Sequence, residues 1–152
     1  MEKELKIRLA QEKDIEAMVA LISLVFSLEK DFAADVEKQR SGLALLLNAA
    51  ERACLVVAEI DGAVIAMCSV QLLVSTAEGG WKAIIEDVAV AEAYRGRGIG
   101  RRLLAYVEEW AQKRDVKRLD LLADRDNEKG LAFYGRMQWR KTNLVALQKS
   151  GG

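Results

Sequence analysis

The chain has 152 residues with equal numbers of basic and acidic side chains, 23 of each, so its formal net charge is zero. This balance argues against bulk electrostatic binding to nucleic acid or to a membrane surface. The sequence contains no histidine, which excludes Ser-His-Asp and Cys-His catalysis and histidine metal sites. Cys54 and Cys68 form no Cys-x-x-Cys motif, so we expect two buried free thiols and no bound metal.

The length fits one domain, which we expect to span residues 1–149 and to leave a disordered tail at 150–152. The N-terminus mixes charges and lacks an apolar signal segment. No apolar run approaches the ~20 residues that are needed to span a bilayer. These features predict a cytoplasmic protein.

The first third of the chain predicts one strand and two helices. Leu5, Ile7 and Leu9 alternate with charged residues, as in a half-buried strand. Apolar residues at helical spacing predict a helix that begins near Asp14. A second helix is predicted for residues 31–48, although a central glycine weakens it enough that it could form two pieces.

The middle of the chain predicts a hairpin and a fourth strand. Residues 53–60 and 63–74 are apolar runs joined by Asp61-Gly62, a turn dipeptide that tolerates positive φ. After a glycine-containing segment, residues 81–90 read as another strand. Hairpin-connected strands of this kind are antiparallel.

The last third predicts a helix, a strand, a short helix and a final strand. The first helix carries Ile99, Leu103 and Val107 on one face. Residues 116–123 are apolar enough for a central strand, 127–137 form a short helix, and 144–147 are a candidate last strand. This order predicts an α/β fold whose single domain has a mixed, mostly antiparallel sheet with helices on both faces.

The segment from Glu86 to Leu104 runs from an apolar strand through three glycines into a basic helix start. Unpaired N–H groups at a helix start and bare glycine backbone favour an anion such as phosphate. Arginines at positions 95, 97, 101 and 102 add positive charge. The glycine spacing fits neither a Walker A loop nor a dinucleotide fingerprint. A solvated glycine turn ahead of a basic helix is the structural alternative.

Two motifs carry a resemblance to the GCN5-related N-acetyltransferase (GNAT) family. The run from Arg95 to Gly100, Arg-Gly-Arg-Gly-Ile-Gly, is similar to the family signature R/Q-x-x-G-x-G/A. The run from Asn127 to Tyr134 resembles N-x-x-A-x-x-F/L-Y, with Gly130 in place of the customary alanine. The order of predicted elements is also similar, so the resemblance covers nearly the whole chain and implies the GNAT-like fold.

The resemblance implies an N-acetyltransferase that uses acetyl-CoA as cosubstrate and acts on a primary amine of a small molecule or peptide. The pyrophosphate of the cosubstrate would lie on the glycine turn, and Asn127 would hydrogen-bond the pantetheine arm unless it only caps its helix. That arm would pair with the strand backbone at Val88 and Val90. The implied pyrophosphate-binding residues are Arg95, Gly96, Arg97, Gly98, Ile99 and Gly100.

Attack on a thioester needs a neutral amine, because an alkylammonium with a pKa of about 10 has no free electron pair. Without histidine, the base is a carboxylate, acting through water, or the solvent itself. Glu86 and Asp87 are adjacent on a predicted strand, which would point them to opposite faces. The pair resembles that of polyamine acetyltransferases, which implies Glu86 as the reactive-side base. Asp87, and a purely structural role for either carboxylate, remain alternatives.

The family resemblance implies that Tyr134 protonates the departing thiolate. Direct transfer within a ternary complex is expected, with a cysteine acetyl carrier as a weaker alternative. The acceptor is expected near residues 27–32 and 74–81, and dimers are common in the family, so a homodimer stays open. Two other classes are a catalytically silent CoA-binding regulator and, less favoured, a nucleic-acid module that uses Arg95, Arg97, Arg101, Arg102 and Arg114 as a stripe.

Overall fold

The structure is a computed structural model that describes residues 4–28 and 35–151. The chain forms two compact units, Met1–Leu122 and Ala123–Gly152. The first unit contains a sheet and three α-helices, and the second contains one α-helix and an extended segment.

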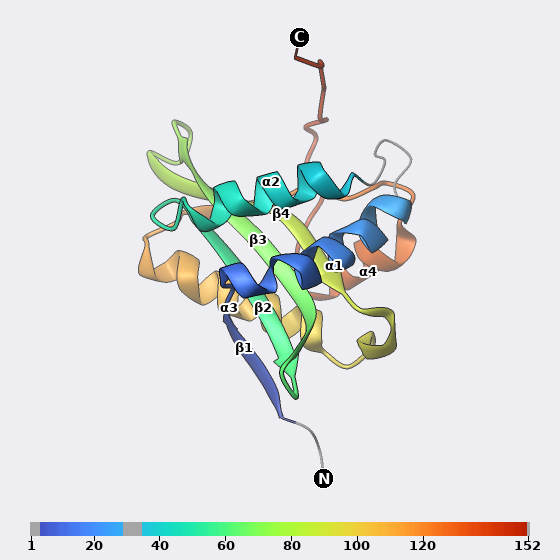
Figure 1. Cartoon of the computed structure of the whole chain (residues 1–152). Helices are drawn as coiled ribbons and strands as arrows, with labels where there is room; N and C mark the ends of the chain where they lie inside the picture. Colours follow the sequence, from blue (N-terminus) through green and yellow to red (C-terminus); the bar gives the residue numbers. More distant parts are fainter. Residues whose placement is uncertain (1–3, 29–34, 152) are drawn as a thin grey trace. The chain divides into compact units, whose positions relative to one another are not determined.

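Five strands of the first unit form one sheet in the order β1-β2-β3-β4-β5 (Figure 1). The pairs β1–β2, β2–β3 and β3–β4 are antiparallel, and β5 runs parallel to β4. This confirms the predicted mixed, mostly antiparallel sheet. The strands are β1 (Leu5–Leu9), β2 (Ala53–Ile60), β3 (Ala63–Ser75), β4 (Gly80–Val90) and β5 (Arg118–Leu121).

Helices cover both faces of this sheet, as predicted: α1 (Ile15–Leu28) and α2 (Val36–Leu47) lie on one face and α3 (Ile99–Lys113) on the other (Figure 1). The α1–α2 face packs Met18, Leu43, Leu55, Met67 and Ala89 into one core. Burying such side chains supplies the main driving force for folding. The helix α2 is continuous through its glycine, and the start predicted for it, residues 31–34, lies outside the described residues.

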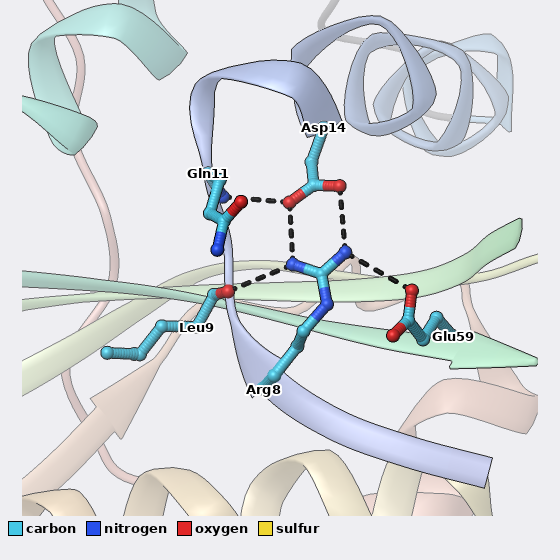
Figure 2. Close-up of polar contacts among 5 residues, drawn as sticks. All are labelled: Arg8, Leu9, Gln11, Asp14 and Glu59. Atoms are coloured by element: carbon cyan, nitrogen blue, oxygen red, sulfur yellow. Dashed lines mark hydrogen bonds and ion pairs between the residues drawn. The ribbon is translucent and has the colours of Figure 1, made fainter. Parts of the chain in front are cut away.

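An arginine-centred network ties β1 to the start of α1 (Figure 2). The Arg8 guanidinium donates to both Asp14 oxygens, at 2.8 and 3.0 Å, and to Glu59 Oε2 at 3.3 Å. Asp14, only 4% exposed, also accepts from the Gln11 backbone N–H at 2.8 Å. Because Arg8 donates to the ionised carboxylate, it lowers the pKa of Asp14. The network closes a short 3-10 turn, Glu12–Asp14, before α1.

The predicted hairpin between β2 and β3 is confirmed. Asp61 and Gly62 have φ angles of 51° and 78°, both in the left-handed region. Two positive φ angles match the type I′ turn, whose twist suits the flanking strands.

The fifth strand is shorter and more peripheral than its sequence predicts. β5 covers only four residues and lies at the edge of the sheet, so the central position predicted for 116–123 is wrong. Arg118 and Asp120 alternate with its leucines and form ion pairs with Glu78 and Lys82. Half-exposed charges of this kind are typical of edge strands.

The second unit, taken by itself, contains α4 (Glu128–Arg136) and an extended segment. The last strand predicted at 144–147 is wrong: this segment has no strand structure, and Leu144 and Leu147 are 85% and 92% exposed. A four-residue apolar run has no stability as a strand without a partner that satisfies its backbone groups. In the described ranges, no helix is long and apolar enough to cross a membrane.

Candidate functional site

Strand β4 contains a bulge at Glu86. In the β3–β4 ladder Ser69 pairs with Asp87 and Val70 with Ile85, so Glu86 is an extra residue without a partner in β3. Directly opposed residues share a face of the sheet. The bulge therefore breaks the strict alternation predicted for Glu86 and Asp87, and the inference that they must point to opposite faces does not hold.

The outer edge of β4 opens after the bulge. β5 pairs only with Lys82 to Ile85, so no described strand pairs with the outer edge of β4 from Glu86 to Val90. The Ala91 N–H donates to Ile65 O in β3. Because every second residue of an antiparallel strand bonds to the same neighbour, Ala91 and every second residue before it bond to β3. The backbone groups of Val88 and Val90 consequently point to the open edge. The Val90 carbonyl accepts from Arg95 Nε at 3.1 Å, which agrees with that direction.

Two carboxyl groups with shifted pKa values lie at the bulge. Asp87 Oδ2 accepts a 2.7 Å hydrogen bond from the hydroxyl of Ser69, a residue with no exposed surface. Burial raises the pKa of Asp87, and the Ser69 hydrogen bond partly opposes that rise. Glu86 remains accessible to solvent, yet desolvation by the surrounding protein, and then the charge of Asp87, raise the pKa of its carboxyl.

The glycine turn between β4 and α3 has the backbone geometry that the sequence predicts. Gly96 and Gly98 have φ angles of 77° and 78°, which side-chain-bearing residues rarely adopt. Gly98 is the N-cap of α3 and provides no side-chain cap, and the first turn of the helix contains no acidic residue. The first backbone N–H groups of α3 therefore lack both a helical acceptor and a capping side chain.

The arginines of this turn are exposed, with two local contacts. Arg95 is tethered to the Val90 carbonyl, and Arg97 lies over the Tyr94 ring at 5.2 Å from its centroid. Arg101 and Arg102 extend the positive surface along the first turn of α3. A helix N-terminus, left-handed glycines and exposed cations together favour a phosphate-type anion.

Asn127 and Tyr134 belong to the second unit. The Asn127 side chain caps α4 by accepting from the Gly130 N–H at 3.1 Å, the capping alternative that the sequence left open. Tyr134 is half-buried and contacts the rings of Phe133 and Trp139 edge-on, with centroids 5.2 and 6.0 Å away.

The two cysteines are buried, as predicted. Burial raises the pKa of the Cys54 thiol to about 11 and also raises that of Cys68. Thiols of this kind are poor nucleophiles at neutral pH, which weighs against a cysteine acetyl carrier. Among the residues that the structure describes, no three His, Cys, Asp or Glu side chains gather into a metal-binding group.

The region expected to select the acceptor is only partly described. Residues 29–34 and the side chains of 26–28 lie outside the described part. In the described part, Glu78 pairs with Arg118 at 3.2 Å and Trp81 is 40% exposed. The sequence prediction missed Ser69, whose signal was a hydroxyl in the middle of the apolar run of β3.

Comparison with known proteins supports the family resemblance. The model of the acetyltransferase (GNAT) family matches residues 18–139, most of the chain. No curated protein matches the sequence at a significant level.

Solved structures show the same fold at low sequence identity. A possible acetyltransferase from Clostridium difficile 630 is 18% identical, with a TM-score of 0.84 and 99% of each chain covered. A ribosomal-protein-alanine N-acetyltransferase from Brucella melitensis biovar Abortus 2308 is 19% identical, with a TM-score of 0.76 and coverage of 98% and 100%. An aminoglycoside N-acetyltransferase in complex with CoA is 15% identical, with a TM-score of 0.84 and coverage of 99% and 97%.

Proposed function

Because the chain belongs to the acetyltransferase (GNAT) family, we propose that it transfers an acetyl group from acetyl-CoA directly to a primary amine. The observation that carries this proposal is the corner between β4 and α3. An open strand edge, two left-handed glycines and an uncapped helix start follow one another within the stretch from Glu86 to Arg101. This combination suits a ligand with an amide-bearing arm and a pyrophosphate.

The residues present fit acetyl-CoA. The backbone N–H groups of residues 96–100 would hold the pyrophosphate, and Arg97 would add charge beside them. Val88 and Val90 have backbone groups on the open edge of β4 that would pair with the amides of the pantetheine arm. Asn127 would contribute a further hydrogen bond to that arm only by sharing or leaving its capping role.

In the proposed reaction, Glu86 removes a proton from the acceptor ammonium, directly or through water, and frees the nitrogen electron pair. The amine nitrogen then forms a bond to the thioester carbonyl carbon, and the carbon–sulfur bond breaks. Tyr134 donates its phenolic proton to the departing thiolate, and the proton that the nitrogen loses on becoming an amide returns to the Tyr134 phenolate, directly or through solvent. The raised pKa of Glu86 supports this role, because a base is most effective when its pKa approaches the working pH.

The acceptor class is an amine on a small molecule or a peptide. The solved structures of similar fold include an aminoglycoside N-acetyltransferase and a ribosomal-protein-alanine N-acetyltransferase, whose named acceptors belong to these two groups. A screen for thiol release from acetyl-CoA with aminoglycosides, polyamines and alanine-terminated peptides tests the proposal. We expect amine-dependent release with at least one group. Release with none of them, at saturating acetyl-CoA, would contradict the proposed activity.

A further inference from the structure

We propose that Ser69 is a positioning residue that fixes the Asp87 carboxylate beside the bulge and thereby tunes Glu86 as the base. The role of Glu86 in catalysis rests on the proposed function. The coupling between these three residues does not, because it is a property of the unliganded sheet.

Ser69 lies where its hydroxyl needs a hydrogen-bond partner. It lies in the middle of β3 with no exposed surface, between the fully buried residues Cys68 and Val70. A hydroxyl buried among apolar neighbours costs free energy unless it is hydrogen-bonded. Its hydrogen bond to Asp87 Oδ2, at 2.7 Å, satisfies that requirement and fixes the carboxylate in one orientation.

The bulge in β4 determines which carboxylate lies opposite Ser69. If the pairing of Val70 with Ile85 continued regularly, Ser69 would lie opposite Glu86. The extra residue shifts the register by one, so that Asp87 takes the place opposite Ser69 and Glu86 becomes the unpaired residue. The same insertion therefore gives Asp87 a buried donor and leaves Glu86 accessible.

Ser69, Asp87 and Glu86 are linked electrostatically. The Ser69 hydroxyl stabilises the ionised form of Asp87 against the cost of burial, and the charge of Asp87 raises the pKa of Glu86. Among the described residues, α1 and α2 contribute apolar core side chains to this face, and the charge of Asp87 also acts on the buried Cys68 thiol. The charged residues of those helices that pair with each other, Glu16, Glu37 and Arg40, lie near the surface.

The test is a carboxyl NMR titration of the full-length protein in four forms: wild type, Ser69→Ala, Asp87→Asn and Ser75→Ala. Ser69→Ala is expected to raise the pKa of Asp87, because the donor to its carboxylate is lost. Asp87→Asn keeps an oxygen that accepts from Ser69 but removes the charge, and is expected to lower the pKa of Glu86. Ser75→Ala is the control, because Ser75 is a buried serine of the same strand whose hydroxyl accepts from the Glu78 N–H. This variant is expected to change the pKa of neither Asp87 nor Glu86.

Identical Asp87 titration in wild type and Ser69→Ala, or identical Glu86 titration in wild type and Asp87→Asn, would overturn the proposal. If Ser69→Ala does not fold, Ser69→Thr retains the hydroxyl and should titrate as wild type, so that a changed Asp87 curve in that variant also contradicts it. The Asp87→Asn arm does not depend on either serine variant.

A kinetic arm separates this inference from the proposed function. In Asp87→Asn the acid limb of kcat/KM against pH is expected to move to lower pH, in step with the NMR titration of Glu86. Acetyl transfer with an unmoved limb would refute the tuning and leave the acetyltransferase proposal intact. Complete absence of transfer in the wild type would refute the activity, while the two titrations would still decide the coupling.

Discussion

The Asn127 side chain occupies the space that a Cβ atom at Gly130 would need. A Cβ built on Gly130 would lie 2.6 Å from Asn127 Nδ2 and 3.0 Å from its Cγ. The glycine thus lets the Asn127 carboxamide fold over the first turn of α4 and accept from the Gly130 N–H. In this chain the absence of a Cβ at position 130 therefore leaves room for the capping carboxamide.

Gly130→Ala is therefore expected to cancel the usual gain from replacing a helical glycine. The substitution favours the helix by roughly 0.5–1 kcal/mol but displaces a cap worth about 1 kcal/mol. Gly135→Ala, in the same helix, meets no atom within 4 Å and should stabilise α4 by up to about 1 kcal/mol. Hydrogen exchange of the α4 amides distinguishes the two variants. Equal protection in both would contradict the steric relationship.

Arg8→Met is expected to destabilise the protein by about 2–4 kcal/mol at pH 7, because it leaves the nearly buried Asp14 carboxylate without its ion-pair partner. Urea unfolding measures this loss. Lys113→Met removes one side of an exposed pair with Glu109, in which both side chains are more than two-thirds exposed, and should cost less than about 1 kcal/mol. A comparable loss in both variants would contradict the structural role of the Arg8 network.

The same network makes stability dependent on pH. Arg8 lowers the pKa of both Asp14 and Glu59 in the folded protein. The stabilisation is therefore complete above the unfolded values, about 3.9 and 4.3, and is lost as pH falls through the lower folded values. We expect the stability difference between wild type and Arg8→Met to shrink below about pH 4. A difference that stays constant down to pH 2 would argue against the linkage.

Glu86→Gln is expected to lower kcat/KM by about 10²-fold and to remove the acid limb of the pH profile. A base works only when deprotonated, so the rate should rise with pH through the pKa of Glu86, which is raised above the usual glutamate value. Glu108→Gln, at an exposed position on α3, is the matched control and should retain the limb. Retention of the limb in Glu86→Gln would reassign the base to Asp87 or solvent.

Tyr134→Phe is expected to lower kcat by about 10²-fold, with little change in acetyl-CoA affinity. The effect lies at the low end for acid catalysis because a thiolate, with a pKa near 8.5, already leaves well. Tyr106→Phe, on α3, provides a control that removes a phenol from the first unit. Initial rates under saturating acetyl-CoA measure kcat. An equally active Tyr134→Phe would exclude Tyr134 as the acid.

Most of the fold could be predicted because its signals are local. Asp61-Gly62 predicts the hairpin through the φ angles that it tolerates, and glycines 96 and 98 predict the turn before α3 for the same reason. The apolar face of α3 is regular enough to identify its buried residues.

The bulge could not be predicted, so the sequence predicted the wrong alternation for Glu86 and Asp87. Ala83, Ile85 and Ala89 are all buried and all odd-numbered, so the alternation continues as if no residue had been inserted. The bulge nevertheless places Ile85 on the opposite face from Ala89. Both side chains can be buried because helices cover each face of the sheet (Figure 1). The position of β5 was mispredicted because the leucines near it suggested a buried strand, whereas all four residues of β5 are only partly buried.

The central claim, that the glycine turn before α3 binds the pyrophosphate of acetyl-CoA, is tested most directly by calorimetric titration of acetyl-CoA into wild type, Gly98→Asp and Gly62→Asp. The two glycines share a φ angle of 78° and open surroundings, so the substitutions impose similar backbone strain, but Gly62 lies in the β2–β3 hairpin. We expect wild type and Gly62→Asp to bind alike and Gly98→Asp to lose at least about tenfold in affinity, or 1.4 kcal/mol. Equal binding by all three proteins would contradict the account.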